Sequence, residues 1–301
     1  MSGPVRRLAT VDLMLFATVV IWAFNLTVTR YLLMHGFRPL AYGAIRYGAA
    51  ALVFAALTYA FERTLRIGGR ESLLVLAAAV GALFVNQICF VYALKFTTAT
   101  TVALILGSTP IFTALISRVL GLERLPPAFW FAALVSFGGV ALVALGSGGS
   151  FSSDLKGDLL AIALAISWSA YSVAIAPLMR TYSPYRISSV VLLVMWIPLA
   201  AISAPQLAEQ DYGDLGALVW LGLVYAVLGP LVLTNVLYFR AIDRVGPSHA
   251  NLFTNLQPFV AVIFAIGILS EKLTALEIAG GCAIGAGILL ARRTAAMVPV
   301  E

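Results

Sequence analysis

The chain has 301 residues, of which 61% are hydrophobic and only 11% are charged. An average soluble domain carries about 25% charged residues, so the composition excludes a soluble globular protein and predicts a polytopic membrane protein. The net charge of +6 does not indicate a nucleic-acid partner, because the basic residues stand singly or in pairs between apolar runs.

Long runs with no charge, or with one, predict membrane-spanning helices along the whole chain. A hydrocarbon core of about 30 Å needs about 20 apolar residues in a helix, and continuous rather than alternating apolar runs favour helices over barrel strands. Arg6 and Arg7 precede the first run, but no small-x-small cleavage site follows, so we interpret that run as a helix. The ten predicted spans lie within residues 12–34, 40–61, 72–94, 96–117, 125–153, 158–180, 187–208, 215–239, 245–270 and 273–291.

A repeat at a spacing of 148 residues divides the chain in two. Between residues 86–125 and residues 234–273, the matched pairs are Ala93 and Ala241, Leu104 and Leu252, Pro110 and Pro258, Glu123 and Glu271, and Leu125 and Leu273. Asp12 and Trp22 stand ten apart at the start of one half, as Asp158 and Trp168 do in the other. The pattern predicts a duplication: a first five-helix repeat at 1–146, a linker at 147–157, a second repeat at 158–293 and a tail at 294–301.

The distribution of basic residues predicts that the two repeats are inverted. With the N-terminus in the cytoplasm, thirteen Arg and Lys fall on the inner side, four fall on the outer side, and Arg30 and Arg46 fall within spans. The positive-inside rule therefore places both termini in the cytoplasm. Five helices is an odd number, so the second repeat inserts upside down, as in carriers that expose one site alternately to each side. Duplication for structural reasons alone is the alternative.

Two tryptophans and one arginine are candidates for a central cavity. Trp22 and Trp168 lie about ten residues, or ~15 Å, from the start of their spans, with Asn25 and Tyr171 close by on the same helices. Arg46 lies inside the span 40–61, where a charge faces a partner or a wet cavity. We predict that it binds a substrate carboxylate, which suits guanidinium geometry. Core packing of the tryptophans, and an outward-snorkelling Arg46, are the alternatives.

Amide side chains and prolines mark the other predicted cavity-lining helices. Buried amides need a partner helix or a cavity, and a proline tends to kink a helix and free a carbonyl. The predicted binding residues are Trp22, Asn25, Arg46, Asn86, Trp168, Tyr171, Asn235, Asn251 and Asn255, with Pro110 and Pro258 as hinges. Static bends and interhelical hydrogen bonds are the alternative. Two glycine-rich spans are predicted to be packing helices, through Gly138, Gly139, Gly280, Gly281, Gly285 and Gly287.

These residues resemble the drug/metabolite transporter superfamily, and in particular its ten-helix EamA-type members. The resemblance rests on Trp22 and Trp168, on the Pro110…Glu123 and Pro258…Glu271 blocks, and on the glycine-rich last helix of each half. It implies that helices 1–4 and 6–9 surround a central pocket, with helices 5 and 10 at the periphery, in a bacterial inner-membrane metabolite exporter. The chain looks most similar to YddG-type exporters of aromatic and other amino acids. Small multidrug relatives use a glutamate embedded in the first helix, where this chain has only Asp12 at the end.

We therefore expect an all-α secondary transporter of the inner (plasma) membrane that exports small metabolites, most of all amino acids including aromatic ones. Expected partners are the small-molecule substrate and membrane lipid, with no nucleic acid, no metal and no cofactor, in a monomer or weak homodimer. An exporter of other metabolites or drugs, or a channel-like facilitator, is the alternative. An intramembrane enzyme is disfavoured, because His35 and His249 lie near opposite faces and no embedded aspartate pair or HExxH motif occurs.

Overall fold

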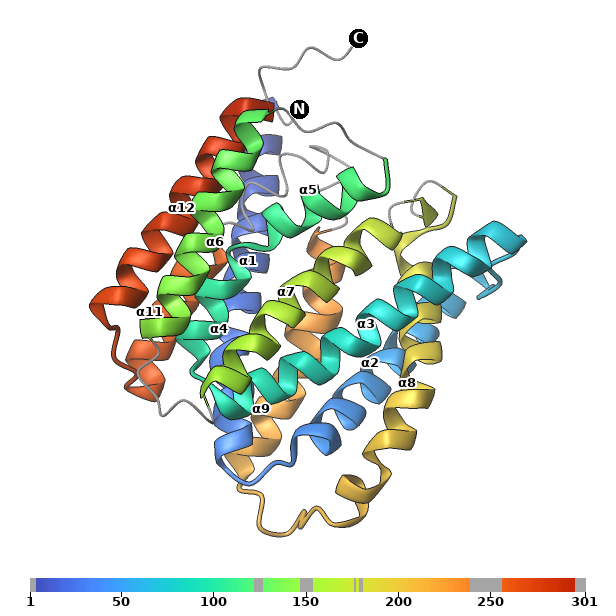
Figure 1. The fold of residues 1–301 in the computed structure, drawn as a ribbon. Coiled ribbons are helices and arrows are strands. Elements are labelled where there is room, and N and C mark those ends of the chain that lie inside the picture. Colours follow the sequence, from blue (N-terminus) through green and yellow to red (C-terminus); the bar gives the residue numbers. More distant parts are fainter. Residues whose placement is uncertain are drawn as a thin grey trace. The chain divides into compact units, whose positions relative to one another are not determined.

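The computed structural model describes residues 4–121, 127–146, 154–175, 177–178, 181–238 and 256–295, and these residues contain helices but no strand (Figure 1). The helices are α1 (Pro4–Met34), α2 (Pro39–Glu62), α3 (Arg70–Phe96), α4 (Ala99–Leu106), α5 (Thr109–Val119), α6 (Pro127–Gly146), α7 (Asp154–Ile175), α8 (Pro184–Ala208), α9 (Ala217–Val227), the π-helix η2 (Leu228–Leu233), α11 (Gln257–Leu269) and α12 (Ala275–Ala295).

Six of the described helices are long and apolar enough to cross a membrane: α1, α2, α3, α7, α8 and the span Ala217–Tyr238, which contains α9 and η2. Helices α4 and α5 are bent by 45° at a short break, a geometry shared by a broken span and a re-entrant loop, and they bring the number of spans to seven if they cross as one. Three shorter apolar helices follow the same composition, at Trp130–Val143, Gln257–Leu269 and Ala275–Gly287. A polytopic, all-helical membrane protein is thus confirmed, while ten crossings, inverted repeats and cytoplasmic termini stay predictions.

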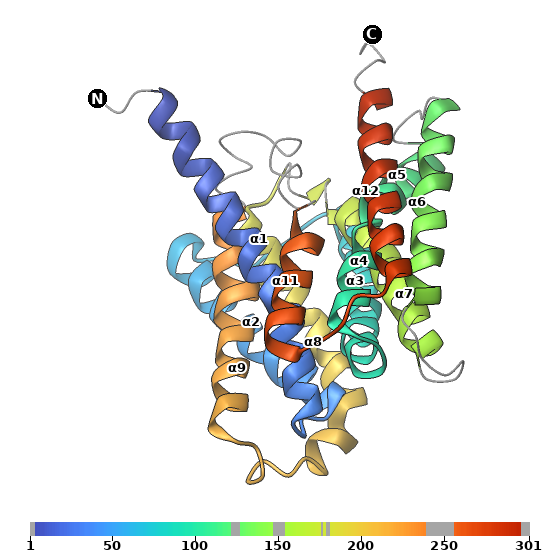
Figure 2. The ribbon, with the colours of Figure 1, turned by 90° about the vertical axis from the view of Figure 1, so that its left-hand side faces the viewer.

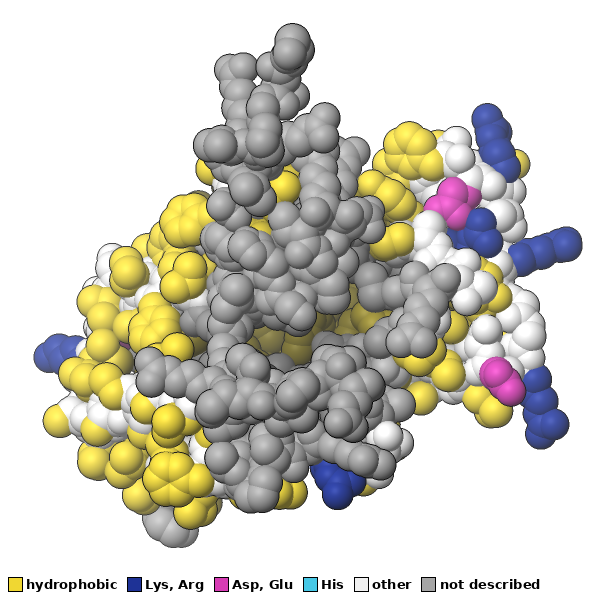
Figure 3. Space-filling model, turned by 90° about the horizontal axis from the view of Figure 1, so that it is seen from above, with side chains coloured by type: hydrophobic (Ala, Val, Ile, Leu, Met, Phe, Trp, Pro, Cys, Tyr) yellow, Lys and Arg dark blue, Asp and Glu magenta, His cyan; other side chains and the backbone are white. Residues whose placement is uncertain are grey.

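Large hydrophobic side chains lie on the outside of the described helices. Leu52, Leu134 and Ile263 are 69%, 69% and 68% exposed. Figure 3 shows hydrophobic side chains over much of the described surface seen from above, with charged side chains toward its edges. A surface with this many exposed leucine and isoleucine side chains is unfavourable in water, and it suits contact with the hydrocarbon chains of a membrane.

The helices form two compact units that each draw on both halves of the sequence. The first unit covers Met1–Arg66 and Tyr182–Ser270, and the second covers Ile67–Thr181 and Glu271–Glu301. In the first unit α2 packs against α8, and α1 packs against α9 and α11 (Figure 2). In the second unit α3 packs against α7, and α6 packs against α12. The units therefore differ from the sequence halves 1–146 and 158–293.

Side-chain hydrogen bonds and an ion pair join α2 to α8 and the residues that follow it, at both ends of the pair in the first unit. The first backbone N–H groups of a helix have no acceptor within it. The N–H groups of Arg38 and Leu40 donate to the Oε1 atoms of Gln210 and Gln206, at 2.7 and 2.8 Å. At the opposite end, Glu62 accepts from the Arg186 guanidinium at 2.7 and 3.0 Å. The pair is thus held at both termini.

A glutamate from a distant part of the chain caps the start of α4 in the second unit. Thr98 Oγ1 accepts from the N–H of Thr101 at 3.0 Å. The two carboxylate oxygens of Glu271 accept from the N–H groups of Ala99 and Thr100, at 3.0 and 2.9 Å. Glu277 instead forms a capping box with Thr274 at the start of α12. Both acidic side chains thus have structural roles at helix N-termini.

Replacement of Glu271 should destabilise the second unit. Glu271→Ala removes the acceptor of two backbone N–H groups, and the loss of an N-terminal cap costs about 1–2 kcal/mol. We expect a lower midpoint of thermal unfolding for the purified protein in detergent, whereas Lys272→Ala, at the exposed neighbouring position, should leave it unchanged. Equal midpoints for both variants would contradict the capping role.

Glycines allow close contact between α6 and α12, as predicted for packing helices. A Cβ added at Gly139 would lie 2.6 Å from the carbonyl oxygen of Gly280, and one at Gly287 would lie 2.7 Å from that of Ala132. Not every glycine of the predicted set lies at this contact: a Cβ at Gly138 would meet open space, and one at Gly281 would meet the side chain of Leu104. Among the described glycines, backbone contact between α6 and α12 thus involves Gly139, Gly146, Gly280 and Gly287.

Adjacent glycines in α6 offer a matched test of this contact. Gly139→Ala should lower thermal stability, because overpacking against a backbone costs about 1–3 kcal/mol. Gly138→Ala should leave stability the same or raise it slightly, since alanine favours the helix. Fluorescence-detected size-exclusion after heating would measure both, and a larger loss for Gly138→Ala would show that the helices pack differently.

Candidate functional site

A wide helical turn in the first unit organises the polar groups that the sequence predicts for the membrane interior. Pro230 lies in η2 and has no N–H, so it cannot donate to the carbonyl of Ala226, four residues back. At the C-terminal end of the turn, the N–H of Thr234 bonds to Gly229, five residues back. Single π-turns of this kind occur often at functional sites.

Arg46 donates to the carbonyl of Ala226, whose donor in a regular α-helix would be residue 230, a proline without an N–H. Its Nε atom lies 3.1 Å from the oxygen of Ala226. The side chain is only 4% exposed, and its guanidinium carbon lies 5.8 and 5.5 Å from the ring centres of Tyr42 and Tyr47. Aromatic faces stabilise a nearby cation. The charge is therefore buried between α2 and α9 and does not snorkel outward.

Helix α1 supports the wide turn from another side. The indole Nε1 of Trp22 donates to the carbonyl oxygen of Pro230 at 3.1 Å, and the Thr234 hydroxyl donates to the same oxygen at 2.6 Å. In the reverse direction, the Tyr225 hydroxyl donates to the carbonyl of Ile21 at 2.8 Å. Hydrogen bonds therefore link α1 to the α9–η2 span at Pro230 and at Tyr225, five residues earlier.

The Oδ1 atom of Asn25, like the hydroxyls of Thr27 and Ser189, is a buried polar atom of the first unit that no described protein group uses. Asn25 is 6% exposed. It shares one face of α1 with Trp22 and Thr29. Trp22 contacts η2, and the hydroxyls of Thr29 and Tyr42 lie 2.9 Å apart. A buried acceptor without a donor costs about 1–3 kcal/mol, so an N–H group from a ligand would be stabilised here.

The other predicted amides are engaged within their own units. Asn86 donates to the carbonyl of Leu164 at 3.1 Å, and its Oδ1 accepts from Gln87 at 2.9 Å, which matches the alternative of an interhelical hydrogen bond between α3 and α7. Asn235 donates to the carbonyl of Leu231 in its own span. Asn251 and Asn255 lie outside the described residues.

The aromatic candidates have different surroundings in the two units. The Trp22 ring lies 5.3 Å from the ring of Tyr238 in the first unit. In the second unit, Trp168 is 38% exposed and its ring lies 5.6 Å from that of Tyr171, one turn along α7. Each tryptophan therefore has an aromatic neighbour, and Trp168 has the more open face.

Both predicted hinge prolines stand in the first turn of a helix. Helix α4 ends at Leu106, α5 begins at Thr109 with Pro110 next, and the Thr109 hydroxyl donates to the Leu106 carbonyl at 2.6 Å. Pro258 occupies the same position in α11. A proline there loses no hydrogen bond. Pro110 therefore begins a second helix after a break, in place of the predicted kink within one helix.

The sequence interpretation missed Pro230, and with it the Ala226 carbonyl and Tyr42. A signal was present, because Gly229 and Pro230 interrupt the apolar run 215–239 and a proline inside a helix always removes one backbone donor. The structure brings Trp22 and Arg46 to the two sides of this turn, with Asn25 on the same face of α1 as Trp22. Asn86, Trp168 and Tyr171 belong to the other unit.

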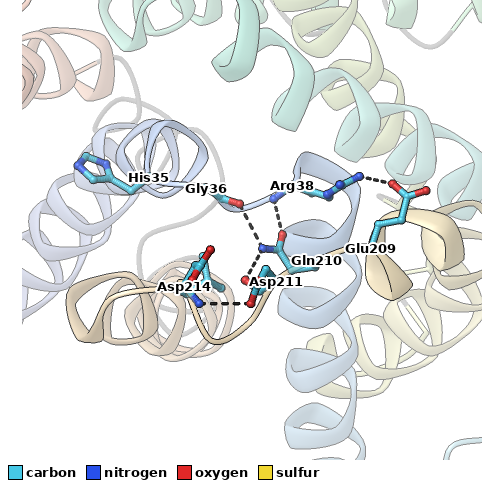
Figure 4. Close-up of a pocket in the computed structure, with 8 residues that line it drawn as sticks. His35, Gly36, Arg38, Glu209, Gln210, Asp211 and Asp214 are labelled. Atoms are coloured by element: carbon cyan, nitrogen blue, oxygen red, sulfur yellow. Dashed lines mark hydrogen bonds and ion pairs between the residues drawn. The ribbon is translucent and has the colours of Figure 1, made fainter.

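A polar cavity lies at the helix ends of the first unit (Figure 4). It has a volume of about 250 Å³ and is lined by His35, Gly36, Arg38, Glu209, Gln210, Asp211, Asp214 and Leu215. Its polar groups bond to one another: Arg38 pairs with Glu209, and Gln210 donates to the carbonyls of Gly36 and Asp211 at 3.2 and 3.0 Å. This cavity therefore belongs to the contacts that close the loops between helices.

Apolar spans, a broken helix and a buried cation at a helical distortion are together typical of polytopic membrane transporters. The sequence profile of the EamA-like transporter family matches residues 9–145 and again residues 155–293. The chain belongs to this family, within the drug/metabolite transporter superfamily, as predicted.

Similar proteins include transporters from two bacteria. Two Bacillus subtilis proteins, YetK and YdeK, are both described as uncharacterized transporters. YetK is 25% identical over 80% of this chain and 74% of its own length. YdeK is 26% identical over 93% of this chain and 96% of its own length. The Escherichia coli protein YedA, an uncharacterized inner membrane transporter, is 25% identical over 87% of this chain and 84% of its own. Their names carry no substrate, so similarity to amino-acid exporters stays a prediction.

A solved crystal structure supports the fold. It aligns with a TM-score of 0.67 over 96% of this chain and 99% of the other, at 20% sequence identity. The relatives named as transporters agree with the expectation that the chain is not an enzyme.

Stability should separate the two buried asparagines. Asn86→Leu removes a donor from the Leu164 carbonyl and a partner from Gln87, so we expect a loss of about 1–3 kcal/mol. Asn25→Leu removes an acceptor that no described group uses, and the unfolding midpoint should stay equal or rise. Thermal unfolding in detergent would measure both, and a large loss for Asn25→Leu would reveal a protein partner for Asn25.

Proposed function

We propose that this chain is an exporter of α-amino acids, including aromatic ones, in the inner (plasma) membrane. The observation that carries the proposal is the pair of buried polar groups in the first unit. Arg46 offers a guanidinium that matches a substrate carboxylate, and Asn25 offers a buried acceptor that matches an ammonium group. A zwitterionic headgroup needs both.

The aromatic pairs favour substrates with large apolar or aromatic side chains. Trp22 with Tyr238, and Trp168 with Tyr171, present ring faces in the two units. Ring faces bind apolar and aromatic groups through large contact areas and specific stacking geometries. Substrate binding at Arg46 would exchange some of its present contacts for the carboxylate.

Alternating access is the mechanism that we propose for movement. The family profile matches twice along the chain, which supports a duplicated architecture. Inverted repeats provide two related arrangements of one site, open to opposite sides. Pro110 and Pro258 would serve as hinges. Facilitated diffusion and proton exchange both fit this scheme.

Transport in proteoliposomes tests the substrate with three related compounds. We expect saturable counterflow of L-phenylalanine, and little of 2-phenylethylamine, which lacks the carboxylate, or 3-phenylpropionate, which lacks the ammonium group. Efflux from preloaded cells would establish direction. Counterflow of unrelated metabolites but of no amino acid would overturn the substrate class, and unsaturable conductance would indicate a channel.

Two substitutions test the roles of the headgroup residues. Asn25→Leu should weaken the binding of L-phenylalanine but not of 3-phenylpropionate, because only the first has an ammonium group. Arg46→Gln should weaken the binding of L-phenylalanine and of 3-phenylpropionate, which both carry a carboxylate, by about 2 kcal/mol, or roughly 30-fold in Kd. The residual binding of 2-phenylethylamine should not change. Equal losses for all three compounds would show that these side chains do not contact the headgroup.

A further inference from the structure

The bond between Arg46 and Ala226 does more than bury a charge. Ala226 is the acceptor that an α-helix would pair with the N–H of residue 230, and Pro230 has none. Within a membrane, a backbone carbonyl without a donor is costly because no water replaces it. The Nε of Arg46, at 3.1 Å, supplies a donor to this carbonyl from α2.

The wide turn is held by side chains on both sides of Pro230. Arg46 acts on the carbonyl before the proline. Trp22 and Thr234 act on the carbonyl of the proline itself, at 3.1 and 2.6 Å. The distortion therefore depends on donors from α1 and α2 as well as on the span that contains it.

We propose that Arg46 is a positioning residue that stabilises the wide turn of the α9–η2 span through its hydrogen bond to the carbonyl of Ala226. We further propose that a ligand carboxylate competes with this carbonyl for the guanidinium, so that binding loosens the turn. A carboxylate is a stronger acceptor than a neutral carbonyl. The second statement rests on the proposed function, whereas the first does not.

The positioning role makes position 230 and Arg46 interdependent. Pro230→Ala restores an N–H that can bond to Ala226 within the helix, so Arg46 is no longer needed there. Arg46→Met keeps the length of the side chain and removes its donors. We expect Arg46→Met to lower the unfolding midpoint in the natural protein, and to lower it by less than half as much in the Pro230→Ala background.

A control substitution separates this coupling from general destabilisation. Arg186→Met breaks the ion pair with Glu62 in the same unit, which involves neither α9 nor η2, and its effect should be the same in the natural protein and in the Pro230→Ala background. If Arg46→Met alone yields no folded protein, recovery of folded protein by Pro230→Ala is the predicted result. Equal effects of Arg46→Met in both backgrounds, or no recovery, would overturn the positioning role.

Hydrogen exchange of the full-length protein in nanodiscs tests the competition. L-Phenylalanine should raise exchange at the amides of residues 226–234 at least threefold, whereas 2-phenylethylamine at equal concentration should not. Transport of L-phenylalanine with unchanged exchange would overturn the competition and leave the proposed function intact. If L-phenylalanine is not transported, the proposed function and the competition both fail, and the double substitution still decides the positioning role.

Discussion

Every backbone carbonyl inside a hydrocarbon layer must find its donor within the protein, and this constraint explains much of the structure. Helices are interrupted or distorted near prolines, and at two of these places a side chain donates to the carbonyl four residues before the proline. Thr109 serves the carbonyl of Leu106 at the start of α5, and Arg46 serves that of Ala226 in the α9–η2 span. The same logic applies to donors, since Glu271 accepts from the first N–H groups of α4.

The two units differ in the groups that their helix contacts bury. In the second unit, the glycine contact of α6 with α12 brings the two backbones together, and the hydroxyl of Ser136 is buried beside Gly287. In the first unit, the packing of α1, α2 and α9 includes a buried cation, an indole donor and an unused amide oxygen. Polar groups of this kind are expensive in a membrane and are retained where they serve a function.

The sequence was sufficient to predict the membrane class, the family and most helices, because apolar runs and proline positions are properties of single segments. It also identified Arg46 as a charge that needs explanation. The sequence could not assign its acceptor, since a backbone carbonyl carries no residue-specific signal. Asn25 and Asn86 likewise cannot be distinguished in the sequence. Only the neighbouring helices show that the Asn86 amide is hydrogen-bonded, whereas the Oδ1 atom of Asn25 has no partner among the described groups. The same holds for Gly138 and Gly139, which differ only in the direction that each faces.

The acceptor of Arg46 is a main-chain atom, and this has a consequence for the evolution of the family. No substitution at position 226 can remove a carbonyl oxygen, so that position is able to drift among small side chains without disturbing the bond. The need for the arginine arises from the proline four residues later. Across related sequences, the residue at position 46 should therefore covary with the presence of proline at 230, although the two side chains have no bond between them.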